Sequence, residues 1–280
     1  MKLTFLGTGN AGVTKYYNTC FLLEDPARQE DPFLLVDAGG GNGILRQLRK
    51  SKVRPGQIQT VFVTHRHLDH ILGVFWLLRD RCQKLSRGEE ILPLVIYGNE
   101  EVTGILRDMT ERLLMTDEVP GFSERVHFAA VGDGETKEIL GRSVTFFDMH
   151  STKAAQSGFC LKSPGGAKLT YCGDEPCSRA CEPYAAGADL LIHEAFCLDA
   201  DREIFRPYEK HHSTVKDACM LAERLAVKTL ALVHTEEKTG KEREARYRKE
   251  GKRYFSGRLW IPEDLSVWDL DGIWDSRKIN

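Results

Sequence analysis

Short runs of apolar residues alternate along the chain with segments in which apolar residues recur at helical spacing. The runs are rich in Val, Ile, Leu and Phe and are bounded by turn residues, a pattern typical of buried strands. They predict strands at 2–6, 18–24, 33–37, 60–64 and 94–97, and in the second half at 125–131, 144–149, 159–163, 169–172, 190–193, 229–233, 258–261 and 266–270.

Helical spacing predicts five helices, at 42–51, 71–84, 100–114, 177–185 and 214–225. In the second of these, Leu72, Phe75, Trp76 and Leu78 form an apolar stripe that is typical of a core-facing helix. Neither a low-complexity linker nor a repeat of fixed period interrupts the alternation. Two strand-rich halves with helices outside predict an α/β fold of stacked sheets covered by helices, in a single domain spanning 1–280.

Composition limits where the protein can be located and which partners it can bind. An apolar fraction of 41% and a charged fraction of 29% are ordinary for a soluble globule. The net charge of −2 means that a nucleic-acid partner would require a local basic patch. The N-terminus lacks the long apolar stretch of an export signal, and no apolar run could cross a bilayer, so we expect a cytoplasmic protein.

The eight cysteines are expected to be reduced thiols, because the chain shows no export signal. Cys172, Cys177 and Cys181 lie close together in sequence, but they lack the CxxC pairs of a zinc ribbon. We therefore interpret these three as buried thiols rather than as a metal site.

The strongest chemical signal follows the expected strand 60–64, where His65, His67, Asp69 and His70 occur within six residues. His65 and His67 are two apart, so in extended backbone both project to one side. Asp69 and His70 follow where the chain turns into the next helix. Four nitrogen and oxygen donors packed this densely favour a site for two adjacent cations over a loop without metal.

This HxHxDH pattern resembles the first motif of the metallo-β-lactamase superfamily, and further family positions follow in order along the chain. The resemblance implies an αββα sandwich of two mixed β-sheets flanked by helices. It also implies a dinuclear metal site. One ion is expected on His65, His67 and His150, the other on Asp69, His70 and His234, with Asp174 shared.

The donor set suits two divalent ions, most readily Zn²⁺, with Mn²⁺ or Fe possible. Members of the superfamily that reduce oxygen at a di-iron centre have a glutamate where His67 stands here. The histidine therefore favours hydrolysis.

Two segments resemble the ribonuclease Z branch: Ala188–Ala195, which contains His193-Glu194-Ala195, and His212-Ser213-Thr214. Taken alone, Ser213 or Thr214 is a plausible helix N-cap, and His193 and Glu194 could simply end a buried strand. Together the segments imply a phosphodiesterase, an endoribonuclease similar to the one that trims tRNA 3′ ends. The resemblance implies that Asp69 orients the nucleophile, and that Glu194 holds His212 against the phosphate or leaving oxygen.

Other features depart from that branch. Only 23 residues separate His150 from Asp174, too few for a long tRNA-binding arm, and His234 is followed by Thr-Glu-Glu-Lys. Two alternatives stay open: a hydrolase of another small substrate, such as a cyclic nucleotide, lactone or thioester, and a non-catalytic metal-containing RNA-binding protein. Segment 238–253 could bind RNA, but its mixed charges favour a solvated helix. The superfamily resemblance also suggests a homodimer.

Overall fold

The computed structural model describes residues 1–274, whose strands form two sheets of seven strands each. The first sheet has the order β14-β1-β2-β3-β4-β5-β6 and the second β13-β12-β11-β10-β9-β8-β7. The run from β3 to β6 is parallel, as is the run from β10 to β13, while the remaining pairs are antiparallel. Both sheets are therefore mixed.

The first sheet consists of β1 (Lys2–Gly7), β2 (Cys20–Glu24), β3 (Phe33–Val36), β4 (Thr60–Phe62), β5 (Leu94–Gly98), β6 (Val126–Ala130) and β14 (Val267–Asp269). The second consists of β7 (Thr136–Ile139), β8 (Arg142–Asp148), β9 (Ser157–Lys162), β10 (Lys168–Tyr171), β11 (Leu190–Glu194), β12 (Thr229–Val233) and β13 (Arg258–Trp260).

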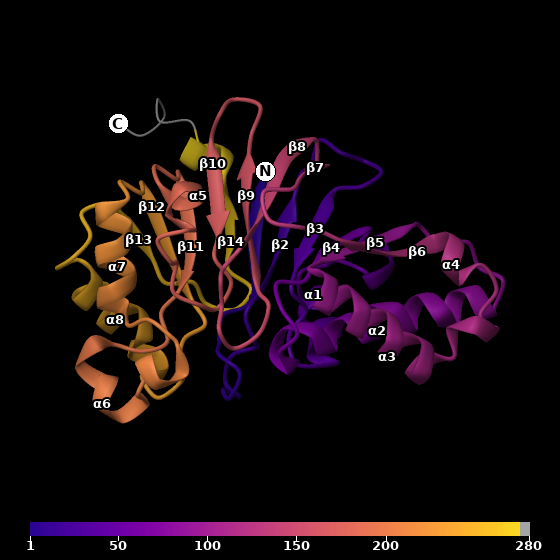
Figure 1. Cartoon of the computed structure of the whole chain (residues 1–280), viewed down its shortest axis with the longest axis horizontal. Coiled ribbons are helices and arrows are strands. Elements are labelled where there is room, and N and C mark those ends of the chain that lie inside the picture. The colour runs from indigo at the N-terminus through magenta and orange to yellow at the C-terminus, as the bar shows by residue number, and fades with distance from the viewer. Residues whose placement is uncertain (275–280) are drawn as a thin grey trace.

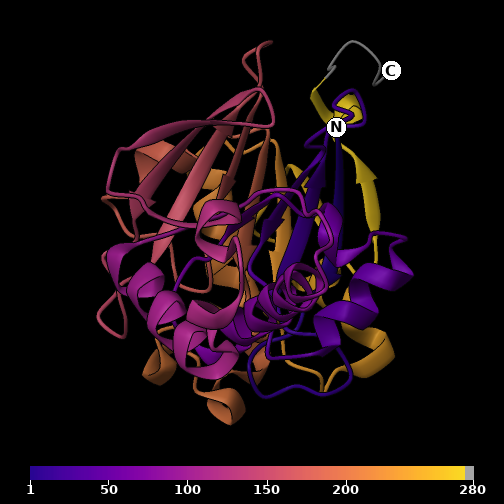
Figure 2. The same ribbon diagram turned by 90° about the vertical axis from the view of Figure 1, so that its right-hand side faces the viewer.

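The helices are α1 (Gly43–Lys50), α2 (Leu68–Ser86), α3 (Glu100–Leu114), α4 (Phe122–Arg125), α5 (Glu182–Ala185), α6 (Arg202–Phe205), α7 (Val215–Arg224), α8 (Arg243–Gly251) and α9 (Asp271–Trp274). Short 3₁₀ turns lie at Pro55–Gln57, Thr116–Glu118, Asp199–Asp201, Tyr208–Lys210 and Gly240–Glu242. Helices α1, α2 and α3 cover one side of the molecule and α7 and α8 the other (Figure 1). Figure 2 shows the first group of helices in front of the sheets.

Apolar side chains fill three layers, one between the sheets and one between each sheet and its helices. In the central layer the aromatic rings of the two sheets meet edge to face. Phe62 of β4 lies 5.7 Å from Phe159 of β9, and Phe21 of β2 lies 4.9 Å from Tyr171 of β10. The predicted αββα sandwich is confirmed.

The structure corrects several predicted elements. Helix α2 begins at Leu68 instead of 71, which puts Asp69 and His70 in its first turn. The helix expected at 177–185 forms only over Glu182–Ala185, because Pro183 favours a helix start and the Cys177 N–H donates to the His193 ring instead. Strand β7 (Thr136–Ile139) was missed, since its sequence is largely polar and half-exposed.

Within residues 1–274, no helix has both the length and the apolar character needed to span a membrane. All eight cysteines are buried and free.

Helix α2 packs directly on the loop that follows β3, and a glycine permits this contact. A Cβ atom at Gly73 would lie 1.8 Å from the carbonyl oxygen of Ala38, and the Gly73 N–H donates to the Gly39 carbonyl at 2.8 Å. Any side chain at this position would therefore push α2 away from the sheet.

We predict that Gly73→Ala lowers the free energy of unfolding by about 1–3 kcal/mol, the usual cost of overpacking. Gly104→Ala is the matched control, because Gly104 lies within α3 with open space around it. That change should stabilise the protein by about 0.5–1 kcal/mol through lower backbone entropy. Urea unfolding of both variants checks the pair, and equal effects would contradict the close packing.

Candidate metal centre

The chemistry-bearing residues lie where parallel strands end, at one rim of the sandwich. Asp37 and His65 follow β3 and β4 of the first sheet. Asp174 follows β10, Glu194 ends β11, and His234 follows β12 of the second sheet. Since each set of strands is parallel, these ends share one edge of each sheet.

Hydrogen bonds between the sheets bring the two edges together. The Ser157 N–H donates to the Thr64 carbonyl at 2.9 Å, just before His65. The His234 N–H donates to the Thr19 hydroxyl at 3.1 Å. The Asn10 N–H donates to the carbonyl of Thr235 at 3.0 Å. Both sheets therefore contribute to the rim, where hydrogen bonds connect them.

One group of potential metal ligands consists of His65, His67 and Asp174, whose ligand atoms all lie within 4.8 Å of one another. His65 Nε2 is 2.8 Å from His67 Nδ1 and 3.6 Å from Asp174 Oδ1. A hydrogen bond of 3.0 Å between the Thr64 hydroxyl and His65 Nδ1 fixes the ring so that Nε2 faces the group.

A second group consists of Asp69, His70 and His234, also within 4.8 Å. Asp69 Oδ2 lies 3.3 Å from His70 Nε2 and 3.6 Å from His234 Nε2. Asp174 Oδ2 lies 3.8 Å from His70 Nε2 and 3.6 Å from His234 Nε2. The two oxygens of Asp174 thus face different groups, Oδ1 the first and Oδ2 the second.

The chemistry of these groups fits divalent cations. Asp69 Oδ2, His70 Nε2 and His234 Nε2 are buried and have no hydrogen-bond partner among the described residues, a state that costs free energy unless a ligand satisfies them. Burial opposes ionisation of Asp69 and Asp174, but the surrounding imidazoles outweigh it and hold the pKa of each carboxyl below its usual value.

The imidazole of His65 is in the state that metal binding requires. Burial, joined by the neighbouring His70 and His67, lowers the pKa of His65 well below its usual value. The ring is therefore neutral at pH 7 and offers a lone pair. Ionised carboxylates beside an imidazole with a free lone pair are donors suited to zinc and similar ions.

A buried aspartate outside the predicted set orients this site. Asp37 Oδ2 accepts from His70 Nδ1 at 2.8 Å, which leaves His70 Nε2 toward Asp69. Asp37 Oδ1 accepts from the Thr64 N–H at 2.9 Å. Such a carboxylate–imidazole contact fixes the tautomer and raises the basicity of the other nitrogen.

His150 is the predicted ligand that the structure does not bring into the cluster. Its side chain is 53% exposed, and Nδ1 lies 3.5 Å from Asp148 Oδ2. The His150 N–H also donates to Asp148 Oδ1 at 2.7 Å, and the backbone is left-handed with φ of 55°. This tight turn directs the imidazole to Asp148 and away from the other ligands.

Gln156, which belongs to no motif, lies next to Asp174. It is 2% exposed, and its Nε2 donates to Asp174 Oδ1 at 2.8 Å. The amide sits so close that a Cβ atom at Gly173 would lie 2.1 Å from it. Gln156 therefore orients the shared carboxylate, as Asp37 orients His70. Both were missed because neither belongs to a motif.

His212 lies beside the second group, and Glu194 lies beside His212. His212 forms a third group with Asp174 and His234, and its ring stacks on Phe196 at 4.8 Å. Glu194 Oε2 faces His212 Nδ1 at 3.7 Å, and neither atom has a hydrogen-bond partner in residues 1–274. Burial raises the pKa of Glu194 and lowers that of His212 to about 3.

We predict that Asp37→Asn lowers the free energy of unfolding by about 1–3 kcal/mol, because an amide NH₂ would face the His70 N–H and leave a buried donor unpaired. The variant could avoid this cost by moving the His70 proton from Nδ1 to Nε2. Urea unfolding measures the first effect and long-range ¹H–¹⁵N NMR the second.

The control for this change is Asp108→Asn. Asp108 is 56% exposed and pairs with Arg112 on the surface of α3, so its loss should cost less than about 0.5 kcal/mol. If both variants kept wild-type stability and His70 kept its tautomer, Asp37 would have no orienting role.

Known proteins resemble this chain over nearly its whole length. Residues 33–235 match the model of the beta-lactamase superfamily domain. Ribonuclease Z of Shouchella clausii (strain KSM-K16) is 29% identical, with 97% of both chains covered. The crystal structure of human tRNase Z, short form, has a TM-score of 0.68 at 25% identity and covers 96% of this chain and 99% of its own.

The metallo-beta-lactamase fold protein YhfI from Bacillus subtilis superposes with a TM-score of 0.75 at 21% identity, covering 95% of this chain and 98% of its own. That likeness supports the fold. The family model spans most of the chain, including the HxHxDH motif, Asp174 and His234. The chain therefore belongs to the metallo-β-lactamase superfamily, and the relatives that it resembles along most of its length include ribonuclease Z.

Proposed function

We propose that this protein is a dinuclear-metal phosphodiesterase of the ribonuclease Z type, with RNA as its substrate. The observation that supports this most directly is the pair of ligand groups that share the two oxygens of Asp174. The resemblance to ribonuclease Z and human tRNase Z directs the choice of substrate.

In this proposal His65 and His67 hold one ion, Asp69, His70 and His234 hold the other, and Asp174 contacts both. The superfamily resemblance gives a further position on the first ion to His150, which in this structure faces Asp148. Zinc suits this set of imidazoles and carboxylates best, with Mn²⁺ or Fe as alternatives. When bound, the two cations supply an activated water nucleophile and offset charge on the phosphate.

The chain's own residues supply positioning and proton handling. Asp69 Oδ2 has no hydrogen-bond partner among the described residues, so it can accept a hydrogen bond from the attacking water. His212 is neutral at pH 7 because its pKa is about 3. It therefore acts first as a hydrogen-bond donor to a phosphate oxygen. Glu194 Oε2 lies 3.7 Å from the ring, and an approach to hydrogen-bond distance when substrate binds would hold the imidazole for that role.

The alternatives are a hydrolase of a cyclic nucleotide, lactone or thioester, and a metal-containing RNA-binding protein without turnover. The Glu194–His212 pair favours phosphodiester chemistry over the other bonds. A protein that only binds RNA would not need two groups of metal ligands whose buried atoms lack hydrogen-bond partners. Their presence counts against a non-catalytic RNA-binding protein. The homodimer and the cytoplasmic location stay predictions.

A substrate comparison tests the proposal. With added Zn²⁺ or Mn²⁺, the protein should hydrolyse bis-p-nitrophenyl phosphate and cleave a tRNA precursor, but leave a lactone and a thioester intact. Asp174→Ala should lose most bound metal by elemental analysis, together with both activities. His127→Ala is the control, because His127 is exposed on β6 outside all three groups. Turnover of only the lactone or thioester would refute the proposal, as would full metal content in Asp174→Ala.

We further predict that His212→Ala keeps its metal content yet loses about 10²–10⁴-fold in kcat on the phosphodiesters, the usual contribution of such a group. His211→Ala provides a matched control, because His211 is the adjacent residue and is exposed. Steady-state kinetics with metal analysis on the same samples checks the pair. An unchanged kcat in His212→Ala would remove this side chain from the mechanism.

A further inference from the structure

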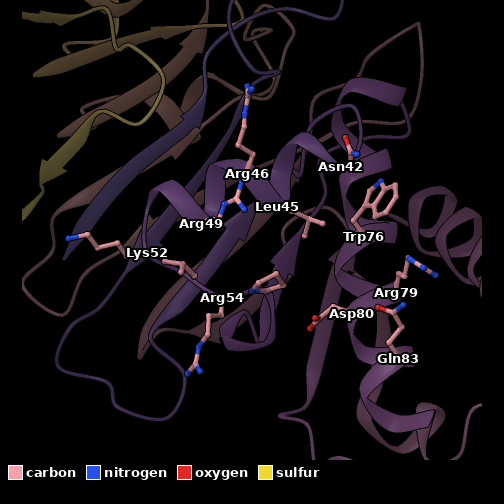
Figure 3. A pocket seen from close by; sticks show the side chains of 12 residues that line it. Asn42, Leu45, Arg46, Arg49, Lys52, Arg54, Trp76, Arg79, Asp80 and Gln83 are labelled. Carbon is pink, nitrogen blue, oxygen red and sulfur yellow. The ribbon is translucent and has the colours of Figure 1, made fainter. Parts of the chain in front are cut away.

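A groove lies between α1 and α2 on the outer face of the first sheet. It has a volume of about 780 Å³, and α1, the following turn and α2 line it. Figure 3 shows the side chains that surround it, among them Asn42 at one end and the Trp76 indole on α2. Trp76 is 36% exposed, so part of its indole ring faces solvent.

The groove is strongly cationic. Its positive residues are Arg46, Arg49, Lys52, Arg54 and Arg79. None of these five makes an ion pair with a carboxylate of residues 1–274, and the one acid in the lining, Asp80, pairs with Lys84 at 2.7 Å. In a chain of net charge −2, five uncompensated cations in one groove mark a site for a polyanion.

One loop, between β3 and α1, connects the groove with the candidate metal centre. A Cβ atom at Gly40 would lie 3.8 Å from the Asp69 Cα, and Asn42 lines the groove. Gly40 and Asn42 are both exposed, so a substrate can contact this loop between the two sites.

Helix α2 determines how far the groove lies from the candidate metal centre. It carries Asp69 in its first turn and Trp76 and Gln83 further along. At a rise of about 1.5 Å per residue, these two lie about 10 and 21 Å along the axis from Asp69. With about 3.4 Å per phosphate along one strand of a duplex, that span corresponds to roughly three to six phosphates from the cleavage position.

We propose that this groove binds the phosphate backbone of the RNA substrate, roughly three to six nucleotides from the bond that is cleaved. This inference rests on the proposed function. The arginines neutralise phosphates, and the exposed Trp76 ring offers a surface on which a base can stack. A mononucleotide-sized phosphodiester bound at the metal centre would not reach the groove.

Two other assignments fit less well. A second copy of the chain docked through this groove about a two-fold axis would place the same five cations opposite one another, which is repulsive. Segment 238–253 is the other basic stretch, but several of its cations are already engaged. Arg246 pairs with Asp201, Arg248 pairs with Glu244, and Arg243 is fully buried.

The test compares two triple variants that remove the same charge. The groove variant is Arg46→Gln, Arg49→Gln, Arg79→Gln. The control is Lys249→Gln, Lys252→Gln, Arg253→Gln, on exposed positions at α8, on the other side of the molecule (Figure 1). Binding of a fluorescent tRNA precursor is followed by anisotropy at 4 °C across a salt series, with the RNA checked for integrity on a denaturing gel.

The groove variant should bind the precursor at least about tenfold more weakly in 0.1 M salt. The slope of log K against log salt should fall by about 2 to 3, from three lost phosphate contacts. Its hydrolysis of bis-p-nitrophenyl phosphate should stay within about twofold of wild type, which also shows that it folds. The control should change affinity by less than about threefold.

Unchanged RNA affinity in the groove variant would overturn the inference, and so would an equal loss in the control. A change of oligomeric state by light scattering, without loss of RNA affinity, would instead assign the groove to a second copy. Failure of the proposed function is distinguished separately, because wild-type protein would then turn over neither bis-p-nitrophenyl phosphate nor the tRNA precursor, whatever the binding data show.

Discussion

The rest of the site depends on the hydrogen bonds that the buried carboxylate of Asp37 accepts. It is fully buried, and it accepts hydrogen bonds from the Thr64 backbone, the Thr64 hydroxyl and His70 Nδ1. A buried charge is tolerated only when such donors surround it, and breaking the set is costly. The end of β3, the end of β4 and the first turn of α2 must therefore keep one mutual arrangement. That arrangement holds the HxHxDH motif in position at the rim.

Much of the fold could be predicted because its strands are buried on both faces and read as continuous apolar runs. The start of α2 was placed too late, since its first turn is made of polar ligand residues that carry no apolar periodicity. The motif also predicted most of the clustered side chains. Asp37 and Gln156 could not be predicted, because their roles come from contacts across 33 and 18 positions of sequence. The turn that directs His150 to Asp148 is likewise a property of the folded backbone.

Three rim residues other than glycine have left-handed backbone: Asp37, His150 and His234, with φ of 55°, 55° and 57°. The same conformation also occurs outside the rim, for example at Leu140 in the central apolar layer. Each such residue costs of order 1–3 kcal/mol, and the surrounding contacts must offset it. At Asp37 and His234 the offsetting contacts are visible, in the bonds to Thr64 and Thr19. At Asp37 and His234 this backbone accompanies side chains that lie within the cluster, whereas at His150 it turns the imidazole to Asp148.

Electrostatics then explains why a groove of cations belongs near this rim. The candidate centre gathers the carboxylates of Asp37, Asp69 and Asp174 within a small buried volume, so a polyanionic substrate must approach several negative side chains. Positive charge placed outside the centre attracts a polyanion that approaches it, because the field of exposed charges extends into solvent. Salt screening limits this attraction to roughly 10 Å. The α1–α2 groove supplies that charge at a distance set by helix α2, so one element fixes both the reacting position and the length of backbone held beside it.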